Sequence, residues 1–357
     1  MKAGIAGGGI MGQLLAFSLI NAGWNVTLFD REMKNNCSMA AAGLLTPTAE
    51  LEKNELIIFD LGEEALRVHW PVILKQLKQT IYFKQSGSLI VSHPRDHSEL
   101  TRFIQTISSK LGNDAFYQKL SNNEIGALEP ELSKFQDGYY FPSEAQIDNQ
   151  QLLHALENDL IEKDITWYKD TFVLDALPHK IILNDTHYQF DLVLDCRGLG
   201  ARAAFNDLRS VRGELIWLEA RDVFITRPIR LMHPRYNLYL VPRENQLYLI
   251  GASEIESYDP SPISVRTMLE LLTSIYSINS KFSEARIIKT VTQCRPTLSD
   301  HLPKIKYSDG LISINGLYRH GFLIAPTLAH DVMQWVETNK IVRHTQLWEN
   351  SHDIHLF

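Results

Sequence analysis

Three glycines near the start of the chain have the spacing of a diphosphate-binding turn. Gly7, Gly9 and Gly12 form a G-x-G-x-x-G pattern. The first glycine permits a tight turn, the second lets the backbone approach a pyrophosphate, and the third lets a helix pack closely on a strand. Free N–H groups and the dipole at the helix N-terminus favour the anion. Asp30 follows where a carboxylate can accept hydrogen bonds from a ribose and repel a 2′-phosphate.

The segments around these residues predict the strand–turn–helix–strand unit that such a site needs. Residues 3–6 are a short apolar run, and residues 14–20 have a helical apolar pattern. A second apolar run, at 26–29, ends at Asp30. Because the whole unit is present, a bound dinucleotide is favoured over a structural glycine turn. Three consecutive glycines without a small-residue cleavage site argue against a signal peptide, and the charged residues 30–32 argue against a membrane span.

The composition is that of a globular protein with room for two domains. The 357 residues include 45% hydrophobic and 22% charged side chains. The net charge of −7, with no basic run, argues against a nucleic-acid partner. Cys37, Cys196 and Cys294 lie far apart and outside any C-x-x-C pair. The sequence therefore predicts no disulfide framework and no metal site, and a reducing compartment, the cytoplasm.

The order of the predicted elements gives an α/β (α+β) fold in which a β-rich domain interrupts a dinucleotide-binding domain. The chain becomes strand-rich after Val211, and the last strand and helix resume the first domain. The glycines at 198–200 lack a third glycine at the right distance, so a separate nicotinamide domain is not expected. The predicted bounds are 1–82, 145–208 and 301–357 for the dinucleotide-binding domain, and 83–144 and 209–300 for the substrate-binding domain.

Four local predictions are specific enough to be compared with the structure. Residues 49–79 form one long helical region with a kink at Pro71. Residues 172–174 and 237–241 form strands, and the final helix lies near 325–336.

Five segments, spread over nearly the whole length, carry a family pattern. Residues 38–47, SMAAAGLLTP, resemble an S-x-A-A-A-G-M-L-A-P segment. LVPR at 240–243 and IGAS at 250–253 resemble Y-I-V-P-R and V-G-A-T strands. Residues 295–303 match R-P-x-x-x-D-x-x-P, and residues 316–326 resemble G-H-Y-R-N-G-I-L-L-A-P. On these motifs the chain resembles the D-amino-acid oxidase superfamily of flavoproteins, and within it the glycine oxidase (ThiO) branch.

Four residues depart from the pattern of that branch. Leu44 stands where Met is frequent, Lys306 where Gly is common, Leu317 where His is usual and His320 where Asn is frequent. These departures affect the expected substrate more than the expected cofactor.

The resemblance implies noncovalent FAD in a Rossmann-like domain of the glutathione-reductase type, interleaved with an antiparallel-sheet substrate domain. The glycines and Asp30 would hold the diphosphate and the adenosine ribose. N–H groups of the segment 319–323 would stabilise the negative charge that develops on the flavin pyrimidine ring. The implied FAD contacts are Gly7, Gly9, Ile10, Met11, Gly12, Asp30, Arg31, Ser38, Ala41, Ala42, Gly43, Leu44, Val173, Cys196, Gly198, Tyr318, Arg319, His320, Gly321, Phe322 and Leu323.

The resemblance also implies a clamp for the carboxylate of an amino-acid substrate. Arg295 is the candidate, because a guanidinium offers two parallel donors to a carboxylate. Tyr239 would donate its hydroxyl to the same group, with Tyr236 or Tyr248 as alternatives, and Arg319 is a third candidate catalytic residue. Each has a plainer interpretation: Arg295 as a surface ion-pair partner, Tyr239 as a core tyrosine and Arg319 as a structural residue.

Two histidines and a cysteine are expected to have ordinary roles. His233 and His320 are interpreted as polar residues without a catalytic role. Cys294 is interpreted as a buried, inert thiol.

Three functions are compatible with these residues. The first is a glycine or small-amine oxidase that forms an imine, then an oxo acid and ammonia, and passes electrons to O2 to give peroxide, as in thiamine thiazole synthesis. The second is a dehydrogenase for D-amino acids or N-methyl amino acids with another acceptor. The third is a non-catalytic flavoprotein. The family also suggests a homo-oligomer.

Overall fold

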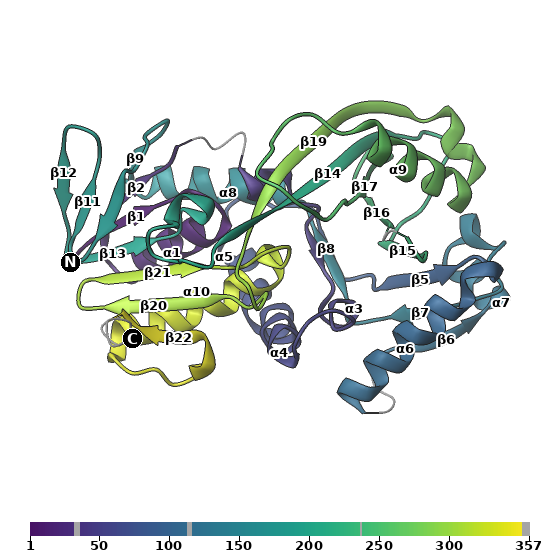
Figure 1. The fold of residues 1–357 in the computed structure, drawn as a ribbon, viewed down its shortest axis with the longest axis horizontal. Helices are drawn as coiled ribbons and strands as arrows, with labels where there is room; N and C mark the ends of the chain where they lie inside the picture. The colour runs from purple at the N-terminus through teal and green to yellow at the C-terminus, as the bar shows by residue number, and fades with distance from the viewer. Residues whose placement is uncertain (32–35, 113–115, 236–237, 352–357) are drawn as a thin grey trace.

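Two large β-sheets organise the structure, a computed structural model that describes residues 1–31, 36–112, 116–235 and 238–351 (Figure 1). The seven-stranded sheet contains both ends of the chain, and the nine-stranded sheet contains the middle. Within the described ranges, every helix is too short or too polar to cross a membrane.

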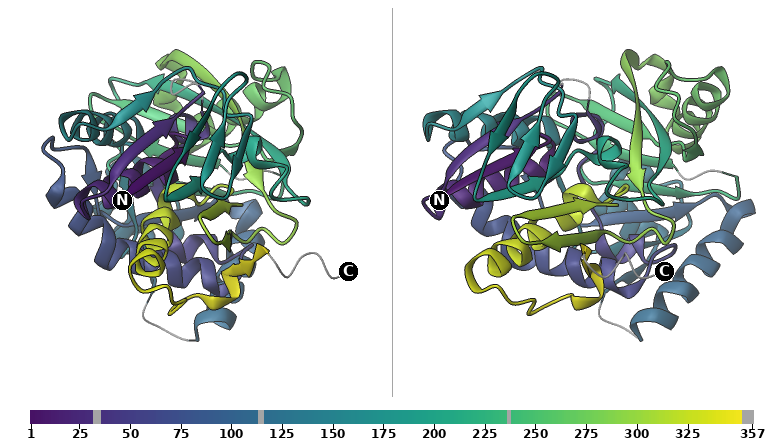
Figure 2. Two further views of the ribbon diagram at one scale, coloured as in Figure 1. Left: turned by 90° about the vertical axis from the view of Figure 1, so that its left-hand side faces the viewer. Right: turned by 60° about the vertical axis from the view of Figure 1, so that its left-hand side comes forward.

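The seven-stranded sheet is built on the predicted βαβ unit. Its strand order is β22 (Trp348–Asn350), β20 (Lys304–Ser308), β21 (Leu311–Asn315), β13 (Leu192–Asp195), β1 (Lys2–Ala6), β2 (Asn25–Phe29) and β9 (Thr166–Tyr168). All neighbours are parallel except β20 and β21. Figure 2 shows strands from both ends of the chain in this sheet, with β13 between β1 and β21. The predicted unit is thus confirmed at the centre of a parallel sheet.

Three helices cover one face of this sheet. They are α1 (Ile10–Asn21), α8 (Asn149–Glu162) and α10 (Gly321–Thr338). α1 packs against both of the others, and its Leu14 and Leu15 are fully buried. The opposite face carries a small sheet of β10 (Asp175–Leu177), β11 (Lys180–Ile182) and β12 (His187–Gln189).

The nine-stranded sheet is mostly antiparallel and has a helix on each face. Its strands are β18 (Ile255–Glu256), β14 (Arg209–Glu219), β17 (Leu247–Gly251), β16 (Leu238–Pro242), β15 (Ile229–Met232), β5 (Ser88–Ser92), β7 (Asp137–Phe141) and β6 (Gln118–Ser121), with β19 (Arg286–Thr297) along β14. Leu89 and Val91 join the core under α9 (Val265–Ile278), whereas Ile90 packs under α6 (His97–Leu111). This alternation follows from the two-residue period of a strand.

The remaining elements connect the two sheets. A third small sheet consists of β3 (Leu44–Leu45), β8 (Ala145–Ile147) and β4 (Phe83–Lys84). The short helices are α2 (Cys37–Ala40), α3 (Pro47–Glu50), α4 (Leu56–Glu64), α5 (Trp70–Gln76) and α7 (Asn122–Leu128). Single 3₁₀ turns lie at Pro94–Asp96, Pro130–Leu132, Gly198–Ala201, Ser280–Glu284 and Thr345–Leu347.

The prediction of one long helix over 49–79 was wrong. The chain leaves the helix between α3 and α4, and a π-helical turn (Ala65–His69) separates α4 from α5. Pro71 lies in the first turn of α5. Proline has no N–H and cannot donate the helical hydrogen bond to the carbonyl four residues earlier. The wider π-helical turn before Pro71 fits this missing bond.

The predicted strand at 172–174 is wrong too, because these residues form a loop. The predicted strand at 237–241 corresponds to β16, although Asn237 lies outside the described residues. The last helix begins at Gly321, earlier than predicted, and contains Pro326. Proline cannot bond to the Phe322 carbonyl four residues earlier, and Trp70 Nε1 donates to that carbonyl instead, at 3.2 Å.

The turn between β1 and α1 requires glycine for steric reasons. Gly7 has a φ of +104°, and a Cβ there would lie 2.5 Å from the Cys196 carbonyl oxygen. A Cβ on Gly12 would lie 1.9 Å from the Gly7 carbonyl oxygen. The third glycine of the motif therefore allows α1 to pack on its own turn.

We expect Gly12→Ala to lower the free energy of unfolding by about 1–3 kcal/mol, because α1 must move away from β1. Gly126→Ala is the control. Gly126 lies inside α7, and a Cβ there would meet nothing closer than the Ser133 Cβ at 3.4 Å. That change should be neutral or stabilise by up to about 1 kcal/mol. Urea unfolding of the apoproteins measures both, and equal effects would contradict the packing argument.

Candidate active site

One cavity of about 560 Å³ lies between the two large sheets and is lined by almost all of the predicted site residues. The size is within the usual range for small-molecule sites. Among the predicted residues only Gly12 is absent from the lining, because it packs behind the turn. The predicted residues that line it are Gly7, Gly9, Ile10, Met11, Asp30, Arg31, Ser38, Ala41, Ala42, Gly43, Leu44, Val173, Cys196, Gly198, Tyr239, Arg295, Tyr318, Arg319, His320, Gly321, Phe322 and Leu323.

The N-terminus of α1 opens into this cavity. The first helical N–H, of Ile10, donates to Ser38 Oγ at 3.0 Å, and the Gln13 N–H bonds to the Gly9 carbonyl. The remaining N–H groups of a first helical turn have no partner within the helix. This end of the cavity therefore favours an anion such as a diphosphate.

Asp30 provides an unused acceptor beside that helix end. Its Oδ1 accepts from the Gly8 N–H at 3.2 Å, while its buried Oδ2 has no partner among the described residues. Burial raises the pKa of Asp30, and the Gly8 hydrogen bond opposes this. A buried carboxylate oxygen without a partner is costly. Because ribose hydroxyls would satisfy it, the residues present fit the adenosine half of FAD.

The flat middle of the cavity is formed by backbone that side chains hold from outside. Gly43 has a φ of +62°, and a Cβ there would lie 2.0 Å from the Ile147 carbonyl oxygen. Arg243 is buried and donates to the Ala42 carbonyl at 2.5 Å and to the Ile147 carbonyl at 3.1 Å. Asn149 Nδ2 donates to the Ser38 carbonyl at 2.8 Å. These contacts hold the backbone of the segment in the cavity lining, where small residues leave room for a planar ring.

The sequence predicted neither Arg243 nor Asn149 as part of the site. Arg243 ends a segment that carries the family resemblance, which is the one signal that could have singled it out. Asn149 lies at the start of α8, without any pattern that links it to residue 38.

The loop at 172–174 is also held from behind. Arg197 forms a bidentate ion pair with Asp195, with N–O distances of 2.7 and 2.8 Å. The same guanidinium donates to the carbonyls of Val173 at 3.3 Å and Leu174 at 3.2 Å. Arg197 thereby fixes the Val173 backbone at the nucleotide end, and no pattern in the sequence indicated this contact.

The N-terminus of α10 faces the cavity opposite the Gly43 segment. His320 caps this helix, and its carbonyl accepts from the Ile324 N–H at 2.9 Å. Gly321 and Leu323 lie in the first turn, where N–H groups have no partner within the helix. Burial, followed by the charge of Arg319, lowers the pKa of His320, so its ring is neutral. Its Nε2 lies 3.2 Å from Asn54 Oδ1, which fits a polar structural residue.

Arg295 lies at the substrate end and differs from Arg197 and Arg319, the ion-paired arginines of the cavity lining. Its Nη1 donates to the Ser253 carbonyl at 3.1 Å, and its guanidinium packs against Gly213. Within the described part of the chain, no carboxylate oxygen is in ion-pair distance of it. Burial lowers the pKa of Arg295. This guanidinium is therefore available to a carboxylate ligand.

Tyr239 lines the same cavity, and burial raises the pKa of its hydroxyl. The alternative Tyr248 is a core residue whose hydroxyl donates to the Val223 carbonyl at 2.7 Å. The other alternative, Tyr236, lies outside the described residues. His233 is not part of the cavity lining. Of the described candidates, Tyr239 is thus the one that lines the same cavity as Arg295.

The two cysteines of this region make only weak contacts to the backbone. The Cys37 thiol lies 2.8 Å from the Cys294 carbonyl oxygen, and burial raises its pKa to about 11. The Cys294 thiol lies 3.6 Å from the Ser257 carbonyl oxygen. Both contacts fit inert, buried thiols.

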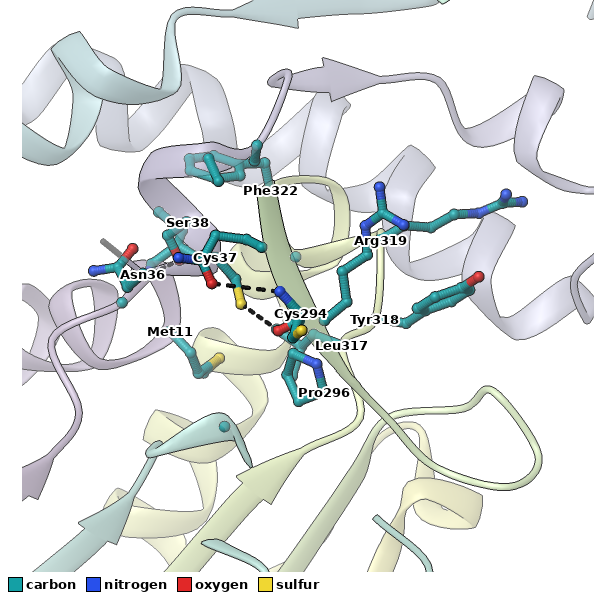
Figure 3. Close-up of a pocket in the computed structure, with 18 of the residues that line it drawn as sticks. Met11, Asn36, Cys37, Ser38, Cys294, Pro296, Leu317, Tyr318, Arg319 and Phe322 are labelled. Atoms are coloured by element: carbon teal, nitrogen blue, oxygen red, sulfur yellow. Dashed lines mark hydrogen bonds between the residues drawn. The ribbon is translucent and has the colours of Figure 1, made fainter. Parts of the chain in front are cut away.

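Arg319 is paired with two carboxylates. Its Nη2 lies 2.8 Å from Glu50 Oε2, and its Nη1 bonds to Glu254. Burial opposes its charge, but Glu50 and Glu254 outweigh this and raise the pKa of Arg319. Figure 3 shows Arg319 and Tyr318 on one side of the Cys294–Pro296 segment, and Asn36 to Ser38 on the other. The geometry favours the structural interpretation of Arg319 over a substrate clamp.

A helix N-terminus and an unpaired acid at one end of a cavity, with a buried guanidinium at the other, are the arrangement of a dinucleotide-dependent oxidoreductase. A family model, "FAD dependent oxidoreductase" (DAO), matches residues 2–335. The chain belongs to this family, and FAD is its cofactor. The predicted fold class and the resemblance to the D-amino-acid oxidase superfamily are thereby confirmed.

Individual proteins resemble the chain over nearly its full length. A putative thiamine biosynthesis oxidoreductase ThiO from Rhizobium etli is 33% identical over 343 residues, which cover 95% of this chain and 98% of that protein. The glycine oxidase structure from Geobacillus kaustophilus has a TM-score of 0.81 at 21% identity, covering 96% and 98% of the two chains. An iminodiacetate oxidase structure from Chelativorans sp. BNC1 has a TM-score of 0.83 at 19% identity, covering 98% and 99%. The two structures share the fold.

We expect Asp30→Ala to weaken FAD binding by about tenfold or more, because the ribose would lose an acceptor that has no other partner. Asp309→Asn is the control, because the Asp309 side chain is 98% exposed. Titration of each apoprotein with FAD, followed by flavin fluorescence, gives the two dissociation constants. Unchanged affinity in Asp30→Ala would contradict the placement of the ribose.

The ion pair of Glu254 predicts a pH-dependent stability. Burial opposes ionisation of Glu254, but Arg319, Lys53 and Arg295 outweigh it and lower its pKa to about 2. Because the folded-state pKa lies below the ordinary value of 4.5, the stabilisation is complete above 4.5 and is lost as the pH falls towards 2. Since the pair is partly solvated, we expect it to contribute about 1 kcal/mol.

Urea unfolding of the wild type and of Glu254→Gln between pH 3 and 7 tests this dependence. The difference in unfolding free energy should be constant above pH 5 and shrink below it. Glu256→Gln serves as the control, because the Glu256 side chain is 62% exposed and its ion pair should contribute little at any pH. A difference for Glu254→Gln that stays constant down to pH 3 would contradict the expectation.

Proposed function

We propose that the protein is an amine oxidase for glycine or another small amino acid. It would convert the amine, O2 and water to an oxo acid, ammonia and hydrogen peroxide. The observation that carries the proposal is Arg295, a partly buried guanidinium without an ion-pair partner among the described residues, in the same cavity as the N-terminus of α1. Such a group binds the carboxylate of an amino acid through two parallel hydrogen bonds.

The residues around the cavity would orient the substrate and keep water away. Arg295 would hold the carboxylate, and Tyr239 would donate its hydroxyl to the same group. When bound, FAD supplies the acceptor for the hydride that leaves the substrate Cα. The N-terminal turn of α10, with Gly321 and Leu323, would present N–H donors where negative charge develops. His320 is neutral and bonded to Asn54, so we assign it no proton transfer.

The choice of a small substrate rests on the proteins that the chain resembles. The names of the relatives agree with it, since they include a glycine oxidase and a thiamine biosynthesis oxidoreductase. We therefore propose a role in making the thiazole of thiamine.

The acceptor, the compartment and the assembly complete the proposal. Peroxide formation in air, measured against reduction of a dye without air, distinguishes O2 from another acceptor. The three free thiols support a cytoplasmic location. A homo-oligomer is proposed from the family resemblance, and light scattering of the purified protein would determine its size.

We expect anaerobic glycine to bleach the flavin of the wild type, whereas Arg295→Met should reduce kcat/KM about 100-fold or more, because the carboxylate loses its charged partner. Tyr239→Phe should reduce it about tenfold through one lost hydrogen bond. Arg266→Met, on the exposed side of α9, is the control for loss of a guanidinium. Retained flavin absorbance shows that each variant still holds FAD.

The proposal fails if wild-type flavin stays oxidised with glycine, sarcosine and small D-amino acids. A non-catalytic flavoprotein would behave in this way. Dye reduction without peroxide would instead indicate a dehydrogenase on the same site.

A further inference from the structure

Four charged side chains form one ionic network at the mouth of the cavity. Glu50 comes from α3, Lys53 from the turn after it, Glu254 from the segment after β17, and Arg319 from the loop before α10. Arg319 bonds to both carboxylates, and Lys53 Nζ lies 3.3 Å from Glu254 Oε2. Glu254 is thus the member that joins the two cations.

The formal charges of this network cancel, because it contains two acids and two bases. Among the described residues, Arg295 forms no ion pair with this network, and its Nη1 donates to the carbonyl of Ser253, the residue before Glu254. Within the described residues, the substrate end of the cavity therefore presents a single uncompensated positive charge. An amino acid with one carboxylate and a neutral amine carries the matching charge of −1.

We infer that Glu254 restricts the substrate to molecules with a single carboxylate. The inference rests on the proposed function, because it takes Arg295 as the carboxylate clamp. A second substrate carboxylate would enter beside Glu254, which lines the same cavity as Arg295 and Tyr239. Two carboxylates repel strongly in a partly buried site, and such repulsion is an effective way to reject a competing ligand.

The neutral variant Glu254→Gln should reverse this restriction. With the acid removed, Arg319 and Lys53 together exceed the charge of Glu50, and the substrate end has two uncompensated positive charges. A dicarboxylate then matches the site better than a monocarboxylate does. Iminodiacetate is a suitable dicarboxylate for such a test, because one protein of the same fold is an iminodiacetate oxidase.

The first test measures binding to the FAD-loaded protein. Acetate and malonate are titrated into wild type, Glu254→Gln and the control Glu256→Gln, and flavin absorbance or heat gives the dissociation constants. The wild type should prefer acetate. In Glu254→Gln the ratio of malonate to acetate affinity should rise about tenfold or more, whereas the control should keep the wild-type ratio.

The second test measures turnover of glycine and of iminodiacetate. The ratio of kcat/KM for iminodiacetate to that for glycine should rise in Glu254→Gln by a similar factor. A network that only held the segments together would change both substrates alike and leave the ratio unchanged. An unchanged ratio, or an equal change in Glu256→Gln, would overturn the inference.

A second variant serves if Glu254→Gln does not fold. Lys53 is 45% exposed, so Lys53→Met should be tolerated, and it leaves Glu254 with less compensation. Malonate should then bind about two- to fivefold more weakly relative to acetate. A higher malonate ratio would overturn the inference.

The tests separate this inference from the proposed function. If glycine is oxidised and the carboxylate ratios do not respond to Glu254, the inference fails and the function stands. If the ratios respond but no amine bleaches the flavin, the function fails and the charge selection stands.

Discussion

The site depends on the partial burial of one positive charge, that of Arg295, without an ion-pair partner in the described part of the chain. Burying an uncompensated charge is unfavourable, and proteins generally pair such groups. Here the neighbouring cation Arg319 is neutralised by Glu50 and Glu254, so the two guanidiniums do not compete for the same ligand. In the proposed function, the substrate carboxylate would complete the pairing of Arg295, and substrate binding would relieve an unfavourable interaction.

The glycine-containing segments around the cavity depend instead on close approach of the main chain. Gly7, Gly12 and Gly43 each allow a main-chain approach that a Cβ would prevent. Backbone alone cannot hold its own position, so buried polar side chains behind it supply the hydrogen bonds. Arg243 does this for the Ala42–Gly43 segment, and Arg197 for the loop at 172–174.

The sequence predicted the parts of the fold that depend on local pattern. The βαβ unit, the glycine turn and Asp30 follow from spacing within thirty residues, and the family motifs led to Arg295 and Tyr239. The contacts of Arg243 and Asn149 could not be predicted, because each bonds to carbonyls about a hundred or more residues away. Hydrogen bonds between residues so far apart in the chain produce no periodic pattern in the sequence.

The wrong predictions for residues 172–174 and for the start of α10 also arise from long-range contacts. Residues 172–174 have an apolar run suited to a strand, but Arg197 takes the carbonyls that a ladder would use. The start of α10 was missed because glycine and proline at 321 and 326 argue against a helix. The helix forms because tertiary contacts replace the hydrogen bond that Pro326 lacks.

The hydrogen bond from Trp70 that replaces the missing one links α5 to α10. The indole of Trp70, which precedes Pro71 in α5, bonds to a carbonyl in the turn of α10 that faces the flavin site. The first turn of α10 is therefore held from a helix that lies outside the cavity lining. A substitution at Trp70 would thus act on the wall of the cavity while every lining residue stays the same.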